Sequence, residues 1–344
     1  MLRVSLVILL LFFLAAVAFV GAHGAWLKRF LRRREAGLVE GRTILARVVS
    51  SPTLDSSDVA QLRALPQRVQ LRLLIELIRH LGGDVRDRMQ LIAAELGIVE
   101  RARELSDSPF WWDRLQALRV LTALAREEEA LRFLKDRNSA VRAQAVEWAG
   151  DHPTPAVVRA LLDMLDDPDT VSRFAVQDSV LRLGLVVAEP LAAKLAAASG
   201  PAVIPALEVA AALGQGVFAG PAIRLCSDSD ARVRARAADV LGAIHASDGI
   251  DALTQLLIDP VAEVRAAAAQ ALGRIGHWPA ATSVARLLRD PAFDVRRSAG
   301  LALRLLGSPG MLLLARYRSD ADHFAADMAR QVLDLPDTRH QQTA

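Results

Sequence analysis

The sequence has very little of several residue types. It contains one cysteine, Cys226, and one tyrosine, and aromatic residues make up only 5% of its 344 residues. A single cysteine excludes a disulfide framework and any zinc site with four cysteine ligands. The scarcity of aromatic residues argues against a β-sandwich, whose strands are rich in aromatic and β-branched side chains.

Small aliphatic residues fill the place of the missing aromatics. Hydrophobic residues make up 52% of the chain and consist mostly of Ala, Leu and Val. This content excludes a disordered chain, which would be poor in apolar residues. Alanine and leucine are strong helix formers, so the composition favours closely packed helices and an all-α fold.

Basic residues are concentrated at the N-terminus. The formal net charge is +3, but the first 50 residues carry eight basic and two acidic residues, whereas the other 294 carry 34 basic and 37 acidic residues. The body of the chain is therefore slightly acidic. Proteins that bind nucleic acid need clustered positive charge for the phosphate backbone, so we expect no nucleic-acid partner.

The N-terminal segment is apolar and long. From Val4 to Val20 only Ser5 is polar, and this length suffices for a helix to cross a bilayer. A basic cluster follows, made of Lys28, Arg29, Arg32, Arg33 and Arg34. By the positive-inside rule we expect an uncleaved transmembrane anchor at residues 1–25 in the inner (cell) membrane, with the N-terminus outside and the body in the cytoplasm. A cleaved signal peptide is the alternative, since Arg3 and the small residues near Gly24 fit its pattern loosely.

Residues 26–57 are expected to form a basic juxtamembrane helix and a linker. The basic cluster has two interpretations. It acts only as a flank that sets the membrane topology, or it also binds anionic lipid headgroups. Membrane lipid around the N-terminal span is in either case an expected partner.

One charged pattern recurs along the body of the chain. An Asp is followed six residues later by an Arg, in the pairs Asp136 and Arg142, Asp167 and Arg173, Asp228 and Arg234, Asp259 and Arg265, Asp290 and Arg296. Successive aspartates are 31, 61, 31 and 31 residues apart, so the period is about 31. One intermediate unit has lost the pair and holds Ala198 and Ile204 instead. A fixed period of this size is typical of a repeat protein.

Apolar residues follow the same register. The residue before each Arg position, and those four and eight places further on, form three rows that are almost entirely apolar. In three of the units the rows are Val233, Val264 and Val295, then Ala237, Ala268 and Ala299, then Leu241, Leu272 and Leu303. This spacing marks one face of a helix. A second apolar helix precedes each Asp, so each unit is predicted to be a helical hairpin that must stack on its neighbours in an α-solenoid.

The turn residues predict where these helices begin and end. Each Asp is expected to cap the second helix, with Pro168, Pro260 and Pro291 just inside the helix start. Glycines follow the second helix and are expected to end it in a left-handed conformation. They are Gly184, Gly242, Gly276 and Gly307.

The unit resembles the HEAT repeat, in particular the short repeats of the phycobilin lyases. The residues that carry the resemblance are Leu257, Ile258, Asp259 and Pro260, followed by Val264, Arg265, Ala268, Ala271, Leu272 and Gly273, and their counterparts 31 residues later. The resemblance covers residues 125–309 well. It implies an α-solenoid that serves as a binding scaffold, in which the Asp and Arg residues form a structural ladder.

The resemblance also suggests a domain layout. We expect a helical N-terminal spacer or cap at 58–125, HEAT-like repeats at 126–309, and a diverged cap and tail at 310–344 with Asp320 near the Asp position. The layout is similar to that of bacterial membrane-anchored HEAT-repeat proteins. That likeness implies a membrane glycosyltransferase or a signalling protein as the partner.

Two places are candidate partner interfaces. Trp111 and Trp112 begin a predicted helix, and because adjacent residues point in different directions, one ring is expected in the core and the other on the surface. The divergent unit carries Gly200, Pro201 and Pro205, and its second helix is expected to start late because of Pro205. This unit bends the solenoid locally or, in the sharper interpretation, shapes a concave binding site.

No catalytic motif occurs in the sequence. His152, His245 and His277 lack a third metal ligand, and Cys226 is expected to be a buried, unreactive side chain. We therefore expect no catalytic residues, no metal and no cofactor. The ladder residues have an alternative interpretation as an anion-binding groove. The expected function is a membrane-tethered scaffold that binds a protein in the cytoplasm. The alternatives are a chromophore-lyase-like enzyme and a nucleic-acid-binding solenoid.

Overall fold

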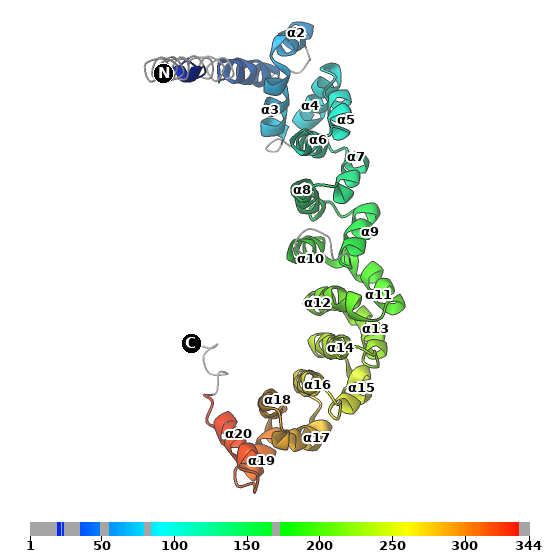
Figure 1. Ribbon diagram of the computed structural model, residues 1–344, viewed down its shortest axis with the longest axis vertical. Helices are drawn as coiled ribbons and strands as arrows, with labels where there is room; N and C mark the ends of the chain where they lie inside the picture. The colour runs from blue at the N-terminus through cyan, green and yellow to red at the C-terminus, as the bar shows by residue number, and fades with distance from the viewer. Residues whose placement is uncertain are drawn as a thin grey trace, which may run out of the picture. The chain divides into compact units, whose positions relative to one another are not determined.

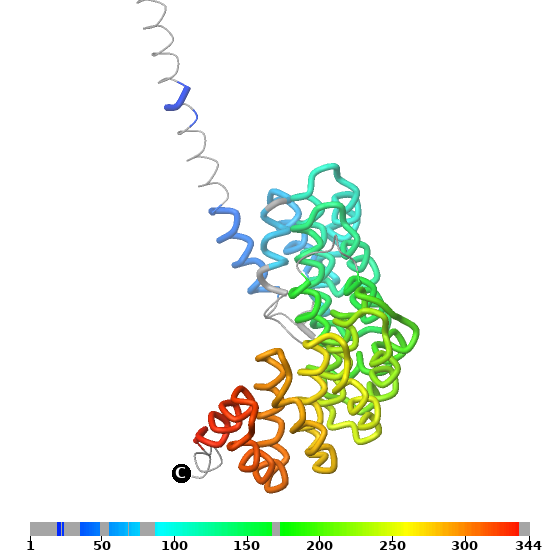
Figure 2. The backbone as a smooth tube through the Cα atoms, turned by 60° about the horizontal axis from the view of Figure 1, so that its bottom comes forward, coloured from blue at the N-terminus to red at the C-terminus, as the bar shows by residue number. Residues whose placement is uncertain are grey.

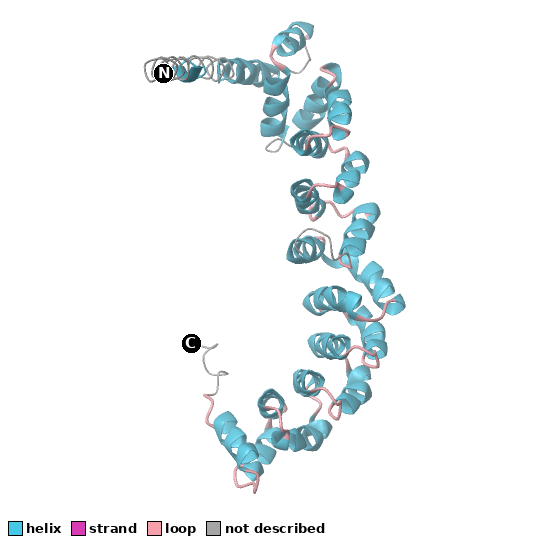
Figure 3. Cartoon of the chain, viewed as in Figure 1, coloured by secondary structure: helices cyan, strands magenta, loops and turns pink. Residues whose placement is uncertain are grey.

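The fold consists of helices and loops. The computed structural model describes residues 19–21, 23, 35–48, 55–78, 84–166 and 173–336, and no strand occurs in these ranges (Figure 3). The predicted all-α class is confirmed. The chain divides into two compact units, Met1–Val141 and Arg142–Ala344. Each unit is described by itself.

The first unit packs short helices around an aliphatic core. Residues 35–48 are helical. Further helices are α2 (Ser56–Ala64), α3 (Gln67–Ile78), α4 (Asp84–Glu95), α5 (Ile98–Ser106), α6 (Trp111–Ala123) and α7 (Glu127–Leu131). Met89, Ile92 and Leu118 are completely buried. α8 (Ser139–Ala149) begins in this unit and ends in the second.

The second unit consists of helical hairpins in two rows (Figure 1). The first helices of the hairpins, which we call the outer helices, are α9 (Pro155–Met164), α11 (Ala188–Ala197), α13 (Ala219–Leu225), α15 (Ile250–Leu256) and α17 (Ala281–Arg286). The second helices, which we call the inner helices, are α10 (Arg173–Arg182), α12 (Ile204–Leu213), α14 (Ala231–Ala243), α16 (Ala262–Ile275) and α18 (Phe293–Leu305). They line the inner side of the curve that this unit follows.

A last hairpin closes the second unit. It is formed by α19 (Ser308–Tyr317) and α20 (His323–Leu333), and the hairpins follow one another in chain order (Figure 2). Arg304 of α18 donates to the carbonyl oxygens of Val332 at 2.9 Å and Leu335 at 2.8 Å. These bonds satisfy carbonyl groups that the end of a helix otherwise leaves unpaired.

The three predicted apolar rows form the core of the second unit. All nine residues on α14, α16 and α18 are 0% exposed; they are Val233, Ala237, Leu241, Val264, Ala268, Leu272, Val295, Ala299 and Leu303. Burying one leucine or valine side chain contributes roughly 1.5–3 kcal/mol. A single hairpin exposes this face, so stacking supplies much of the stability of each unit.

The inner helices approach one another through small residues. A Cβ added at Gly242 would lie 2.8 Å from the Cα of Ala271, and one at Gly273 would lie 2.8 Å from the Cα of Ala302. The prediction that Gly242 ends its helix in a left-handed conformation is therefore wrong. α14 continues to Ala243, and the left-handed residue after it is His245, with φ of 52°. Gly276, with φ of 78°, does end α16 as predicted.

The repeated Asp lies before the inner helix and does not cap it directly. α16 begins at Ala262 with Val261 as its N-cap, and Oδ1 of Asp259 accepts the amide of Val261 at 2.8 Å. Oδ1 of Asp290 accepts the amide of Ala292 at 2.9 Å in the same way. The expectation that this Asp is the N-cap and that Pro260 lies inside the helix is thus wrong by two residues. The Asp instead stabilises the turn that leads into the helix.

The predicted membrane span falls almost wholly outside the described residues, which include only 19–21 and 23 of positions 1–25. The basic flank lies outside them too; its residues are Lys28, Arg29, Arg32, Arg33 and Arg34. None of the helices in the described ranges is long and apolar enough to cross a membrane.

Candidate functional site

The repeated arginines hold consecutive hairpins together. Nε and Nη2 of Arg234 donate to the carboxylate of Asp259 at 2.8 and 2.9 Å, and Nη1 donates to the carbonyl oxygen of Asp228 at 2.9 Å. Each Arg therefore grips the Asp side chain of the next hairpin, 25 residues later. From the Asp six residues before it, the Arg takes only the backbone carbonyl. We call each such bidentate pair a rung.

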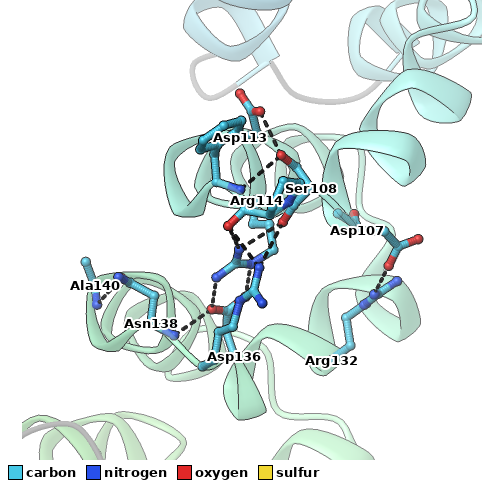
Figure 4. Close-up of polar contacts among 12 residues, drawn as sticks. Asp107, Ser108, Asp113, Arg114, Arg132, Asp136, Asn138 and Ala140 are labelled. Atoms are coloured by element: carbon cyan, nitrogen blue, oxygen red, sulfur yellow. Dashed lines mark hydrogen bonds and ion pairs between the residues drawn. The ribbon is translucent and has the colours of Figure 1, made fainter.

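Two more rungs have the same geometry. Arg265 donates to Asp290 at 2.7 and 2.9 Å. In the first unit Arg114 donates to Asp136 at 2.7 and 2.8 Å and to the carbonyl oxygen of Ser108 at 2.9 Å (Figure 4). The Arg114 and Asp136 side chains are only 6% and 7% exposed. The motif search missed Arg114, because Ser108 stands where the other units have Asp.

The rung carboxylates are held ionised. Burial raises the pKa of Asp259, but the hydrogen bond from Arg234, the amide of Val261 and the charges of Arg234 and Arg265 outweigh burial and lower the pKa below its ordinary value. The same balance, with Arg265 as the partner, lowers the pKa of Asp290. The Arg side chains of these rungs are consumed by structural bonds, which argues against their use as an anion-binding groove.

The other predicted ladder residues differ from this arrangement. Asp167 lies outside the described residues, and Arg142, at the rung spacing before it, has a partner within its own surroundings. Arg173 is exposed and forms no hydrogen bond or ion pair with the residues that the structure describes. Asp320 does occupy the Asp position of the last hairpin, where Arg289 holds it at 3.1 and 2.6 Å.

Arg296 ends the ladder without a carboxylate. Its Nη1 donates to the carbonyl oxygens of Asp290 at 2.8 Å and Pro291 at 2.9 Å, as in the other rungs. Its buried Nε has no hydrogen-bond partner. The guanidinium lies 5.8 Å from the ring centroid of Phe293 and 4.9 Å from that of Phe324, a distance suited to cation–π attraction.

The divergent hairpin replaces a rung with a backbone bond. The amide of Gly200 donates to Oδ2 of Asp228 at 2.9 Å, in the place where an Arg would otherwise donate. Gly200 has φ of 73°, which other residues rarely adopt. Pro201 opens a 3₁₀ turn (Pro201–Val203), and α12 starts only at Ile204, so the predicted late start of this helix is confirmed. Pro205 is buried in its first turn.

The paired tryptophans are both on the surface. Trp111 is 40% exposed, Trp112 53% and Phe110 52%, and the rings of Phe110 and Trp112 stack at 4.7 Å. The expectation that one tryptophan enters the core is wrong, because α6 begins at Trp111 and the buried residues of this helix start only at Arg114.

The isolated candidates for metal binding or nucleophilic chemistry remain apart. No group of three or more His, Cys, Asp or Glu side chains is placed to hold a metal ion in the described part of the chain. Cys226 is 4% exposed, as predicted, and burial raises the pKa of its thiol to about 12. A thiol with so high a pKa is almost wholly protonated at neutral pH and is a poor nucleophile.

A groove lies between the inner helices α16 and α18. Its volume is about 690 Å³. Four charged side chains line it, namely Glu263 and Arg274 from α16 and Asp294 and Arg297 from α18. Sequence reasoning missed the groove, although the 31-residue register places Glu263 beside Asp294 and could have revealed that row. A smaller groove of about 410 Å³ lies between the outer helices α9 and α11, where Lys194 is paired with Asp166 at 2.5 Å.

A family model for HEAT repeats matches residues 99–180, 221–304 and 250–334, which together are more than half of the chain. The chain belongs to the HEAT-repeat family. The match extends on both sides of the range 126–309 in which the motif is clear in the sequence. HEAT repeats account for the hairpins, the stacked core and the two rows of helices.

Solved structures share this HEAT-repeat fold. Kap121p bound to Nup53p is 14% identical, with a TM-score of 0.58 over 85% of this chain and 41% of that one. Kap121p bound to the SUMO protease Ulp1p is 13% identical, with a TM-score of 0.57 over 84% and 40%. The chain thus spans about two fifths of these karyopherin chains. CpcE and CpcF of the phycocyanin lyase from Nostoc are 22% identical over 60% and 93%, but their TM-score of 0.37 carries no argument. No curated protein matches the sequence.

Proposed function

We propose that this HEAT-repeat chain is a non-catalytic scaffold that binds a partner protein through the groove between α16 and α18. The observation that carries the proposal is the groove itself, which is lined by charged side chains on the inner helices. In the same unit the rung arginines Arg234 and Arg265 are occupied by structural bonds, so the groove offers the unit's accessible charges. The karyopherins that share the fold are named in complexes with proteins, which supports a protein ligand.

We propose further that the chain acts at the cytoplasmic face of a membrane. The support is the apolar stretch Val4–Val20 and the basic cluster after it. A membrane protein, such as a glycosyltransferase or a signalling protein, is the partner that this location would favour. Neither the lyase nor the nucleic-acid alternative gains support from the groove, whose four charges are two acidic and two basic.

Site-specific photo-crosslinking in the native host tests the partner site. A photo-crosslinking amino acid replaces Gln270, which lines the groove, or Gln255, which is exposed on the outer helix α15. We expect one protein, identified by mass spectrometry, to be crosslinked from position 270 and again from position 297, and not from position 255. Crosslinks from position 255 alone, or none from 270 in an intact protein, would contradict the proposal.

Membrane fractionation tests the tether separately. We expect the full chain to remain in the membrane pellet after an alkaline carbonate wash, and a variant lacking residues 1–25 to be released. Release of the full chain by the wash would contradict anchoring by a span. It would leave the groove proposal standing, because that proposal depends only on the second unit.

A further inference from the structure

The charged residues of the groove have no partners within the protein. Glu263 and Asp294 lie in the first turns of α16 and α18, Arg297 follows one turn after Asp294, and Arg274 lies in the last turn of α16. Among the described residues, none of these four side chains forms a hydrogen bond or an ion pair. Acidic charge therefore stands at one end of the groove, and basic charge follows toward the other end.

The neighbouring inner helices treat their charges differently. On α14, Arg236 pairs with Asp239 at 2.9 Å and lies 3.8 Å from Glu208 of α12. The side-chain amide of Gln177 on α10 donates to Glu208 at 2.7 Å. The inner face from α10 to α14 thus neutralises its own charges, whereas the groove leaves four of them available to a ligand.

The floor of the groove is narrow and mostly apolar. Ala266 and Ala302 are buried, and Leu301 lies beside them. Gln270 donates to Ser298 at 2.7 Å, which fixes two polar side chains in the middle of the groove. A helix rises 1.5 Å per residue, so the stretch from Ala262 to Arg274 is about 18 Å long. An extended peptide of five or six residues covers that length at about 3.3 Å per residue.

We propose that the groove takes an extended segment of five or six residues from the partner protein, with a defined charge pattern. A basic side chain of the segment contacts Glu263 and Asp294, an apolar residue lies over Ala266 and Ala302, and acidic side chains contact Arg297 and Arg274. This inference rests on the proposed function and specifies the chemistry of the ligand. A nucleic acid or an anionic lipid surface does not fit, because Glu263 and Asp294 would repel its phosphates.

Three synthetic peptides test the charge pattern. They are fluorescein-labelled octapeptides that share one apolar centre and differ only in their ends, which are basic and acidic, both acidic, or both basic. Binding to the full chain is measured by fluorescence anisotropy at low and physiological salt. We expect the basic–acidic peptide to bind at least tenfold tighter than the other two. Equal affinities, or no binding of any peptide, would overturn the inference.

A charge reversal makes the test independent of simple loss of folding. In the double variant Glu263→Lys and Asp294→Lys all four groove charges are positive, so the preference is expected to move to the acidic–acidic peptide. The matched control is Asp248→Lys with Asp251→Lys, which adds the same charge next to and on the outer helix α15. The control is expected to keep the original preference. The same shift in the control would overturn the inference, because the effect would then come from net charge.

The two proposals fail in distinguishable ways. If position 270 crosslinks to one partner but the peptides show no charge preference, the groove binds a protein and the proposed charge pattern is wrong. If position 270 gives no crosslink while the double variant still switches peptide preference, the groove reads charge but the scaffold function is wrong. Circular dichroism of each variant confirms that the helices are intact.

Discussion

The complete rungs and the divergent hairpin solve the same packing problem with different groups. At Asp259 and Asp290 the next-hairpin contact is a bidentate Arg–carboxylate pair. At Asp228 the contact is one backbone amide, that of Gly200, which also holds a carboxylate oxygen at 2.9 Å. A buried carboxylate needs a hydrogen-bond donor, and the comparison shows that a neutral N–H in a glycine turn meets that need.

The replacement depends on local backbone geometry. Ile204 stands at the Arg position and offers no donor, so the turn before α12 must bring its own amide to Asp228. Arg224 adds a second link, because Nη2 donates to the carbonyl oxygens of Leu195 at 2.7 Å and Ala198 at 2.5 Å. The hairpin that ends at Ala198 is therefore tied to the next one through backbone groups, where the complete rungs use two charged side chains.

The largest difference is expected when the Asp itself is removed. Asp259→Ala leaves the buried Arg234 guanidinium without its counter-ion, which costs about 3–5 kcal/mol. Asp228→Ala leaves only a neutral amide without its acceptor and costs about 1–3 kcal/mol. Urea unfolding followed by circular dichroism measures both values. Both variants lose the same turn-stabilising bond to the residue two places on, so equal losses would contradict the comparison.

Removing an Arg at the two ends of the ladder sharpens the same point. Arg265→Leu strands the Asp290 carboxylate, which is 6% exposed, and is expected to cost about 3 kcal/mol. Arg296→Leu strands no carboxylate, because Arg289 already holds Asp320, and is expected to cost about 1 kcal/mol. The denaturation midpoints of the two variants give the ranking. A larger loss for Arg296→Leu would show that its contacts with Phe293 and Phe324 outweigh a rung.

The replacement contact is expected to fail when its glycine is changed. Gly200→Ala places a side chain at φ of 73° and is expected to cost about 1–2 kcal/mol, although nothing lies within 4 Å of the added Cβ. Gly216→Ala is the matched control, since it too has open space but no left-handed φ. The control should change stability by less than 1 kcal/mol in either direction. A harmless Gly200→Ala would mean that this turn is not what holds Asp228.

Acid should erase the advantage of the complete rung. The pKa of Asp259 is lowered in the folded protein, so its rung contributes stability above the ordinary Asp value of 3.8 and loses that contribution as the pH falls through the lowered value. We therefore expect the stability difference between the wild type and Asp259→Asn to be constant at neutral pH and to shrink below about pH 4. Unfolding curves of both proteins between pH 7 and pH 2 measure it. A difference that grows in acid has the wrong sign for this argument.

The comparison also shows how far the sequence could predict the molecule. The 31-residue spacing predicted the hairpins, and the rows containing Val264, Ala268 and Leu272 are fully buried. It did not predict that Arg265 grips the Asp side chain of the next hairpin, because a periodic sequence contains both partners at fixed spacings and only helix packing selects one. The groove was missed for the same reason, since its charges lie on two helices and are far apart in the chain.

The smallest expected effect is the rebuilding of a rung where the chain has none. Ala198 lies 25 residues after Arg173, the spacing of Arg234 and Asp259, and its φ of −95° and ψ of 159° are extended like those of Asp290. Ala198→Asp therefore offers Arg173 a carboxylate. Because Arg173 is exposed and the Gly200 amide is already bound to Asp228, the gain is expected to be at most about 1 kcal/mol. Ala198→Asn, which has the shape without the charge, should give no gain, and Arg173→Gln should abolish the gain of the Asp variant in a double-mutant cycle. A gain that survives Arg173→Gln would show that the new carboxylate stabilises the turn alone, and that the divergent hairpin cannot be returned to the ladder by one residue.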